Sequence, residues 1–491
     1  MTTAPDGRDD EEESGMAETY DLIVIGAGPV GENVADYAHR EGLSTVIVES
    51  ELVGGECSYW ACMPSKALLR PGAALRAAQH VRGAAQAVTG AIDPAEVFAR
   101  RDATVSDYDD GGQVSWLQSA GIDLVRGTAR LDGPKRVVVT ATDGTEVVLE
   151  ATSAVAVCTG SSAAIPPIEG LAEAKPWTSR EATGATSAPG RLVVLGGGVV
   201  GAEMATAFTS LGSKVTMLVR GALLTGAEPF AGELVAKTLR GNGADVRLGA
   251  SASKVERRGG EVHVTLEDGG ELVADEILVA TGRSPRTTGI GMGSVGLEDG
   301  DWFSVDDTLL VDAPTNAEEP WLYAVGDVNH RALLTHQGKY QARAAGRVIA
   351  ARHRGDSPDT GAWTRYTATA DHAAVPQVTF TEPEVASVGL TEDGAVKAGL
   401  KVRAVEYDLA SISGAFVYDD DYEGRAKIVI DDDRDVIVGA TYAGYDVGEM
   451  LQAATIAVVG EVPIQRLWHA VPSYPTISEV WLRLLETDGR A

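Results

Sequence analysis

Cysteine is scarce in this sequence, whose 491 residues include only Cys57, Cys62 and Cys158. Three cysteines are too few for the disulfide framework of a small secreted protein. No uninterrupted apolar run reaches the roughly 18 to 20 residues that a transmembrane helix needs. The N-terminus also lacks the basic and then apolar segments of a signal peptide. We therefore expect a cytoplasmic protein without a membrane partner. In the reducing cytoplasm, a close pair of cysteines is more often catalytic than structural.

Positive charge is scarce too. The chain has 41 Lys and Arg against 71 Asp and Glu, a formal net charge of −30, which argues against a nucleic-acid partner.

Residues 1–19 are predicted to be a disordered acidic tail. The length predicts two to four domains.

Two segments have the strand, tight turn, helix and strand pattern of a βαβ unit. The first covers residues 20–49, with DLIVIG, GAGPVG and TVIVE, and the second begins at Arg191 with RLVVLG and GGGVVG. Two such units predict two nucleotide-binding domains. Residues 134–150 resemble a β-hairpin with an Asp-Gly turn, and residues 155–160 resemble a buried strand that leads into a glycine turn.

The first unit has the residues expected of a dinucleotide site. Gly26 is expected to form the tight turn, Gly28 to let the backbone approach a pyrophosphate, and Gly31 to allow close contact of helix and strand. Glu49 ends the second strand, where an acid accepts hydrogen bonds from a ribose.

The second unit repeats the glycines as Gly196, Gly198 and Gly201, but its second strand ends in Arg220. A positive charge there suits the 2′-phosphate of NADPH. The alternative is a solvated arginine at a strand end, so NADH remains open.

The stretch GGECSYWACMPSK places four residues between Cys57 and Cys62. Two cysteines at this spacing, at the expected start of a helix, can form a strained and reducible disulfide. The helix terminus and nearby Lys66 both favour a thiolate. The alternative is a pair of inert buried cysteines, which the flanking GG and PSK make improbable. Cys158 is expected to be a core residue.

From about Tyr366 the pattern changes to alternating strands and a helix-like segment, GEMLQAATIAVVG, which predicts a separate α+β domain. Motifs from Tyr20 to Glu486 resemble those of the class I pyridine-nucleotide-disulfide oxidoreductases, the group of dihydrolipoamide dehydrogenase, glutathione reductase and mercuric reductase. They are GAGPVG, GGECSYWACMPSK, VCTG, GGGVVGAE, VATGRSP, YAVGD, FTEPEVASVGLTE and PTISE.

The resemblance implies a homodimer of an α/β fold, with two Rossmann-like domains and a C-terminal α+β dimerisation domain. The expected ranges are 20–160 and 283–365 for FAD binding, 161–282 for NAD(P)H binding and 366–491 for dimerisation.

The resemblance also implies roles. Cys62 is the charge-transfer thiol beside the flavin and Cys57 the interchange thiol, while Lys66 and Glu203 form an ion pair near the flavin's reactive nitrogen. The expected FAD contacts are Gly26, Gly28, Gly31, Glu49, Gly55, Lys66, Thr159, Gly160, Asp327, Thr335 and His336. The expected NAD(P)H contacts are Gly196, Gly198, Gly201, Glu203, Arg220 and Gly282.

One motif departs from the family. Its disulfide reducers end in His-Pro-Thr-x-x-Glu, in which the glutamate orients an acid-base histidine supplied by the partner subunit. This chain has Tyr474 at the histidine position and Glu479 at the glutamate. A phenol with a pKa near ~10 can donate a proton but is a poor base. His469 is an alternative acid-base group. The other interpretation of His469 is a half-buried histidine with a structural role only.

We therefore expect an FAD-dependent enzyme that passes electrons from NADPH to the Cys57–Cys62 disulfide and on to a small-molecule disulfide or related acceptor. The alternative acceptor is a quinone, a dye or a metal ion, which needs no histidine. A flavin redox sensor without turnover is a third hypothesis. No resident metal is expected, and the ending LLETDGRA, which has no cysteine pair, argues against mercury reduction and against a long-tailed thioredoxin reductase.

Overall fold

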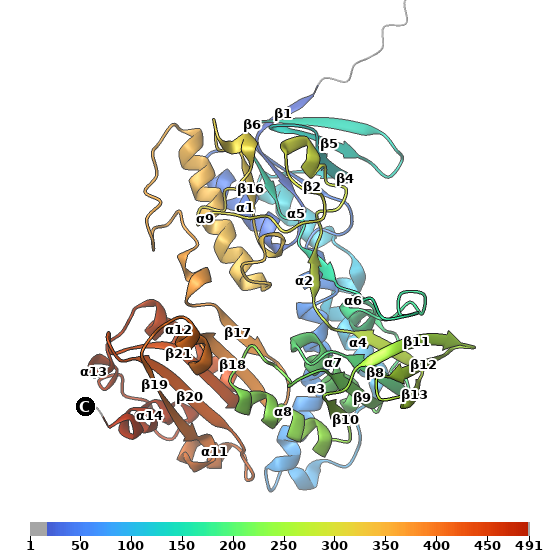
Figure 1. Cartoon of the computed structure of the whole chain (residues 1–491), viewed down its shortest axis with the longest axis vertical. Helices are drawn as coiled ribbons and strands as arrows, with labels where there is room; N and C mark the ends of the chain where they lie inside the picture. Colours follow the sequence, from blue (N-terminus) through green and yellow to red (C-terminus); the bar gives the residue numbers. More distant parts are fainter. Residues whose placement is uncertain (1–16, 490–491) are drawn as a thin grey trace, which may run out of the picture.

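The structure, a computed structural model, describes residues 17–489. Residues 1–16, most of the predicted acidic tail, lie outside this range. The described elements gather into three lobes, with the first at the top of Figure 1 and the other two below it. None of the helices in this range combines the length and apolar character needed to span a bilayer.

The first lobe is built on a seven-stranded sheet in the order β3-β2-β1-β6-β5-β4, with β16 also paired to β6. The strands β1, β2, β3, β6 and β16 are parallel, whereas β4 and β5 are antiparallel additions. Helices α1 and α9 pack together against this sheet (Figure 1). The bounds are β1 (Glu18–Ile25), α1 (Pro29–Arg40), β2 (Thr45–Glu49), β3 (Asp123–Arg126), β4 (Thr128–Leu131), β5 (Arg136–Thr140), β6 (Glu146–Val157), β16 (Leu322–Ala324) and α9 (Thr335–His353).

Two sequence expectations can be compared directly with this sheet. The predicted hairpin is confirmed, because β5 and β6 are antiparallel with Val137 opposite Leu149. The tail was predicted to extend to residue 19, but β1 already begins at Glu18. Glu18 lies opposite Leu149 of β6, and this pairing lengthens the strand beyond its apolar run.

The second lobe has a parallel sheet in the order β10-β9-β8-β14 and an antiparallel sheet in the order β11-β12-β13. The short pair β7 and β15 lies where the chain leaves and re-enters the first lobe. The bounds are β7 (Ser161–Ala163), β8 (Arg191–Leu195), α7 (Val199–Ser210), β9 (Lys214–Val219), α8 (Pro229–Gly241), β10 (Asp245–Leu248), β11 (Ala252–Arg258), β12 (Glu261–Leu266), β13 (Glu271–Ala274), β14 (Glu276–Val279) and β15 (Arg283–Pro285).

The third lobe is an antiparallel sheet in the order β17-β18-β21-β20-β19, covered by helices. Its bounds are β17 (Pro376–Thr379), β18 (Glu384–Gly389), α10 (Glu392–Lys397), β19 (Val402–Asp408), α11 (Ser413–Tyr418), β20 (Arg425–Asp431), β21 (Val436–Gly444), α12 (Val447–Val459), α13 (Ile464–Leu467) and α14 (Val480–Asp488). The predicted class is therefore confirmed: two Rossmann-like units and a C-terminal α+β domain.

Helix α3 (Cys62–His80) connects the lobes. It carries Leu68 and Leu69 into the core of the second lobe, where they join Phe208 of α7 in one hydrophobic cluster. Besides α7, the helices α2 (Gly55–Tyr59), α4 (Pro94–Thr104) and α6 (Ser179–Gly184) pack on α3, whereas α5 (Gly111–Ser119) packs beside β3 in the first lobe. Because α3 begins at Cys62, this packing places the predicted redox pair between the lobes.

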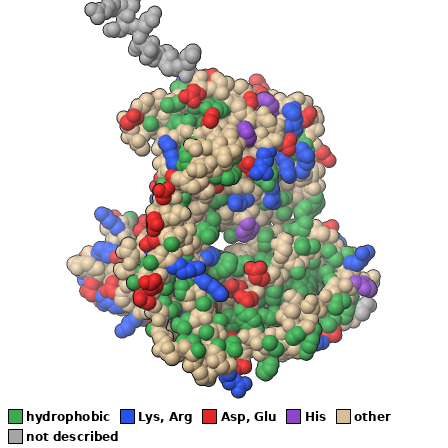
Figure 2. Space-filling model, turned by 180° about the vertical axis from the view of Figure 1, so that it is seen from behind, with side chains coloured by type: hydrophobic (Ala, Val, Ile, Leu, Met, Phe, Trp, Pro, Cys, Tyr) green, Lys and Arg blue, Asp and Glu red, His purple; other side chains and the backbone are tan. Residues whose placement is uncertain are grey.

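Hydrophobic side chains gather on the surface of the third lobe (lower right in Figure 2). The large exposed ones in this lobe are Phe380, Val396, Phe416, Val417, Tyr418, Ile456, Val459, Val471 and Tyr474. An exposed apolar surface of this kind is typical of a protein interface.

Candidate active site

The first glycine turn leaves no room for side chains. Gly26 has φ +100°, and a Cβ there would lie 2.6 Å from the carbonyl oxygen of Cys158. A Cβ on Gly31 would lie 1.9 Å from the carbonyl oxygen of Gly26. Helix α1 starts beyond Gly28 without a side-chain cap, so its first N–H groups are free to bind an anion. Gly55 approaches Gly28 so closely that its Cβ would lie 2.8 Å from the Gly28 Cα.

Glu49 supports this turn. Its carboxylate accepts hydrogen bonds from the backbone N–H groups of Ala27 and Glu51, both at 2.7 Å. The residue lies at the edge of a cavity of about 510 Å³. The other predicted FAD contacts that line this cavity are Gly26, Gly28, Gly55, Thr159, Gly160, Asp327 and Thr335.

Two polar groups of this cavity fit an elongated polar ligand. The Thr159 hydroxyl is buried and has no hydrogen-bond partner among residues 17–489. Asp327, which also lines the cavity, accepts a hydrogen bond of 2.6 Å from the Ser161 hydroxyl through Oδ2, and the same oxygen lies 3.8 Å from the Arg283 Nε. The residues therefore fit FAD, whose ribityl chain and phosphates need such groups. His336 follows Thr335 but is not among the residues that line either cavity, and its ring Nε2 lies 2.7 Å from the carbonyl oxygen of Pro376.

Both predicted redox cysteines are free thiols that line one larger cavity. Cys57 lies in α2, and Cys62 is the first residue of α3. A hydrogen bond from the Cys57 thiol, then the Thr335 hydroxyl at 3.3 Å and the charge of Lys66, lower the pKa of Cys62 to about 6 although burial opposes them. The same hydrogen bond, together with burial, raises the pKa of Cys57. Cys62 is therefore the thiolate of the pair at neutral pH.

Lys66 and Glu203 form the predicted ion pair. The Lys66 Nζ lies 2.9 and 3.1 Å from the two carboxylate oxygens of Glu203, which is 3% exposed. Phe380 completes the group: its backbone N–H donates to Glu203 at 3.0 Å, and its ring centroid lies 4.7 Å from Nζ. All three lobes therefore meet at this ion pair.

The second glycine turn repeats the first. A Cβ on Gly196 would lie 2.2 Å from the Ala280 carbonyl oxygen, and one on Gly201 would lie 2.4 Å from the Gly196 carbonyl oxygen. Gly198 has open space around it. Arg220 is exposed at the end of β9, and no carboxylate within the described chain pairs with it. The larger cavity, of about 1250 Å³, is lined by Cys57, Cys62, Lys66, Gly196, Gly198, Glu203, Arg220, Gly282, Asp327 and Thr335.

The predicted acid-base residues lie apart from the cysteines within one chain. Tyr474 is 74% exposed on the third lobe. Glu479 is buried and binds Arg483 through one oxygen, while its other oxygen has no partner in the described chain. His469 is exposed. None of the three lines either cavity.

Sequence reasoning missed two residues. Phe380 belongs to the motif FTEPE, but no role followed from the motif alone. Glu32 follows Gly31 on α1, and burial raises its pKa to about 7 although Lys339 opposes the shift. An acid directly after the third glycine was the available signal, yet its burial depends on how α9 packs on α1.

The chain is similar to known proteins over nearly its whole length. The pyridine nucleotide-disulphide oxidoreductase profile matches residues 20–347, and the dimerisation domain of that family matches residues 375–484. A dihydrolipoyl dehydrogenase of Thermus scotoductus is 33% identical, covering 94% of this chain and 96% of the relative. A mercuric reductase of Shigella flexneri is 31% identical, covering 96% and 81%. The solved structure of the HOCl-induced flavoprotein disulfide reductase RclA from Escherichia coli, in its Cu(II) complex, has the same fold, with a TM-score of 0.80, 23% identity and coverage of 96% and 99%.

Proposed function

The chain belongs to the pyridine nucleotide-disulphide oxidoreductases, a family of FAD-dependent enzymes, and we propose that it passes electrons from NADPH through FAD to the Cys57–Cys62 pair. A small-molecule disulfide or a related acceptor then reoxidises the pair. The observation that carries this proposal is the shared cavity, in which Cys62, Lys66 and Glu203 lie with the second glycine turn.

The first cavity is the proposed FAD site. When bound, FAD supplies two-electron transfer between a nicotinamide and a disulfide. The backbone around Gly26 and Gly28 holds the pyrophosphate, the free hydroxyl of Thr159 and the carboxylate of Asp327 bind polar groups of the chain, and α9 points its N-terminus into the site from Thr335. The buried, unpartnered hydroxyl of Thr159 supports this assignment.

The second glycine turn is the proposed NADPH site. Gly196, Gly198 and Gly201 form the turn, and Arg220 binds the 2′-phosphate. The exposed guanidinium at the cavity edge supports NADPH over NADH, because a phosphate gains more from a charged donor than a ribose hydroxyl does.

The cysteines have distinct proposed roles. Cys62 remains the thiolate near the flavin, stabilised by the Cys57 thiol, the Thr335 hydroxyl and the Lys66 charge. Cys57 meets the acceptor. The Lys66 ammonium group supplies a positive charge near the reacting groups. Its ion pair with Glu203 already fixes its position, so it needs no reorganisation during the reaction.

We propose that the chain works as a homodimer in a reducing cytoplasm. The dimerisation-domain match and the exposed hydrophobic side chains of the third lobe support the dimer. In a dimer, Tyr474, Glu479 and His469 of one subunit would be available to the other subunit's cysteines.

The acceptor has two candidates. The dihydrolipoyl dehydrogenases among the relatives make lipoamide the first disulfide to test. Tyr474 at the position of the family's histidine favours a second candidate class, namely quinones, dyes or metal ions, whose reduction does not depend on a histidine acid.

A steady-state acceptor screen tests the proposal. Purified wild-type enzyme is compared with Cys57→Ser and Cys62→Ser variants, using NADPH and NADH, on low-molecular-weight disulfides, lipoamide, quinones and metal ions. A dithiol route predicts that both variants lose more than about 10²-fold of the wild-type rate. Rates that survive both substitutions for every acceptor would exclude that route and support direct transfer from the flavin. A colourless protein after reconstitution with FAD would contradict the whole assignment.

A further inference from the structure

The two cysteines flank a short break between helices. Helix α2 ends at Tyr59 and α3 begins at Cys62, so Trp60 and Ala61 form the connection. Neither residue has helical angles: Trp60 has φ −133° and ψ 2°, and Ala61 has φ −135° and ψ −92°. The position of the Cys57 sulfur relative to that of Cys62 therefore depends on what holds this connection.

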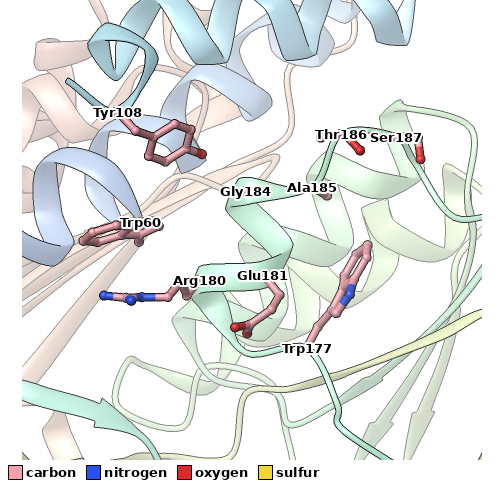
Figure 3. Close-up of a pocket in the computed structure, with 9 residues that line it drawn as sticks. All are labelled: Trp60, Tyr108, Trp177, Arg180, Glu181, Gly184, Ala185, Thr186 and Ser187. Carbon is pink, nitrogen blue, oxygen red and sulfur yellow. The ribbon is translucent and has the colours of Figure 1, made fainter. Parts of the chain in front are cut away.

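Helix α6 holds it by two contacts. The guanidinium carbon of Arg180 lies 3.8 Å from the centroid of the Trp60 ring, a cation–π distance. The Thr183 hydroxyl donates a hydrogen bond of 2.9 Å to the Trp60 carbonyl oxygen. Figure 3 shows the Trp60 ring and the Arg180 guanidinium lying one above the other.

Arg180 also binds the residue before Cys57. It donates to the Glu56 carboxylate at 2.9 Å, and two further hydrogen bonds, of 2.7 and 2.9 Å, join it to Glu51. One side chain therefore contacts both sides of Cys57: the carboxylate that precedes it and the ring that follows it.

Helix α6 is itself firmly placed. Thr178 and Glu181 form a capping box at its start. The buried Arg101 donates to the carbonyl oxygens of Thr183 and Ala185 at its end. The backbone of Trp177, just before the helix, exchanges hydrogen bonds of 2.8 Å with β14. The connection between the cysteines is thus tied to the sheet of the second lobe.

We propose that Arg180 and Thr183 are positioning residues for the Cys57–Cys62 pair, which hold Trp60 so that the two sulfurs stay at closing distance. Arg180 itself lines neither of the two cavities described above, whereas Trp60 lines the first and Thr183 the second. Arg180 therefore acts on the cysteines through Trp60 and Glu56. A looser connection lowers the effective concentration of one thiol at the other and shifts the pair toward the dithiol. This inference rests on the proposed function, because it concerns the same pair.

A thiol–disulfide equilibrium tests it. Holoenzymes of the wild type, Arg180→Ala, Trp60→Ala and the double variant are equilibrated in buffers of reduced and oxidised dithiothreitol. As the Cys57–Cys62 bond forms, two electrons pass from the two sulfurs to oxidised dithiothreitol, whose new thiols take up the Cys57 proton and one proton from the buffer. Acid quenching, alkylation and mass spectrometry then count the thiols, with buried Cys158 as the internal reference.

We expect each single variant to lower the equilibrium constant for disulfide formation about tenfold, which makes the potential about 30 mV less negative. The equilibrium constant of the double variant should fall no further, because both substitutions remove the same contact, the stacking of Arg180 on Trp60. Thr183→Val removes only the hydrogen bond to the Trp60 carbonyl oxygen and should lower the equilibrium constant about threefold. This variant replaces Trp60→Ala if the Trp60→Ala chain does not fold.

Arg286→Gln is the matched control. Arg286 donates to the same Glu56 carboxylate at 2.6 Å but does not supply the stacking contact of Arg180. We expect less than a threefold change for it. The proposal is overturned if Arg180→Ala behaves like the wild type or like the Arg286 variant, or if its effect multiplies with that of Trp60→Ala. A wild-type chain that forms no Cys57–Cys62 disulfide would instead contradict the proposed function.

Discussion

The surroundings of Cys62 and those of Tyr474 differ in how completely one chain builds them. Around Cys62, Lys66 has Glu203, Glu203 has the Phe380 backbone, and the sulfur has the Thr335 hydroxyl. Around Tyr474 the ring is exposed, and the buried Glu479 has one oxygen without a partner in the described chain. The electron-supplying half of the proposed site is thus complete in one chain, while the half that would meet the acceptor is open.

The largest expected effect comes from completing the open half. Tyr474→His should raise kcat/KM for lipoamide about 10²-fold, because an imidazole with a pKa near ~6.5 both donates and accepts protons at neutral pH. Glu479 stands at the position where the family's motif has the glutamate that orients the histidine. Steady-state kinetics with NADPH provide the measurement, and Tyr474→Phe, expected to stay within about twofold of wild type, is the control. No gain from the histidine would show that the open half is not an acid-base site.

The next effect breaks the complete half. Lys66→Met leaves the carboxylate of Glu203 buried without its cation, and we expect the free energy of unfolding to fall by about 2 kcal/mol. This is less than for a fully buried pair, since the Lys66 side chain is 35% exposed. Urea unfolding measures it. Lys397→Met, in an ion pair with Asp393 whose side chains are each 75% exposed, should cost at most about 0.5 kcal/mol. Equal losses in both variants would remove the distinction.

A smaller effect is expected at the exposed edge of the larger cavity. Arg220→Ser should lower kcat/KM for NADPH about tenfold, close to 1.4 kcal/mol, and leave that for NADH nearly unchanged. The control variant Lys214→Ser removes a cation at the other end of β9. It should leave kcat/KM unchanged for both NADPH and NADH. Equal losses for both cofactors in Arg220→Ser would contradict a phosphate contact.

The smallest effect concerns the thiolate. Wild-type Cys62, with a pKa of about 6, should be alkylated half-maximally near pH 6, because the reactive thiolate forms as the pH rises through the pKa. Thr335→Val removes a hydrogen bond that favours the thiolate, so the midpoint should move to higher pH. The pH profile of iodoacetamide alkylation, read by mass spectrometry at Cys62, measures this. Thr455→Val, whose hydroxyl bonds a helix carbonyl in the third lobe, should leave the midpoint in place.

The parts that followed from sequence are those fixed by short spacing. The glycine turns at Gly26 and Gly196 were predictable because each turn forms between a strand and the helix that follows it. The start of α3 at Cys62 and the hairpin of β5 and β6 are equally local. The motifs of the family supplied the pairing of Lys66 with Glu203, which spacing alone could not give.

The parts that sequence did not yield depend on packing between distant segments. Phe380 reaches Glu203 only because the third lobe lies against α7. His336 was expected at the flavin, but its ring lies against the Pro376 carbonyl of the third lobe. Trp60 and Arg180 are 120 positions apart in the chain, and no pattern in either segment indicates their stacking. Their contact exists because α6 is placed by β14 and Arg101.

The return of the chain to its first sheet has a consequence for biosynthesis. Strand β6 ends at Val157, and its parallel neighbour β16 comes only at Leu322–Ala324. All strands of the β10-β9-β8-β14 sheet lie between these two points. A growing polypeptide therefore releases that whole sheet from the ribosome while the earlier one still lacks a strand and helix α9. The first lobe therefore starts before the second lobe but is completed after it. A chain that ends before β16 would contain the whole β10-β9-β8-β14 sheet but could not complete the sheet of the first lobe.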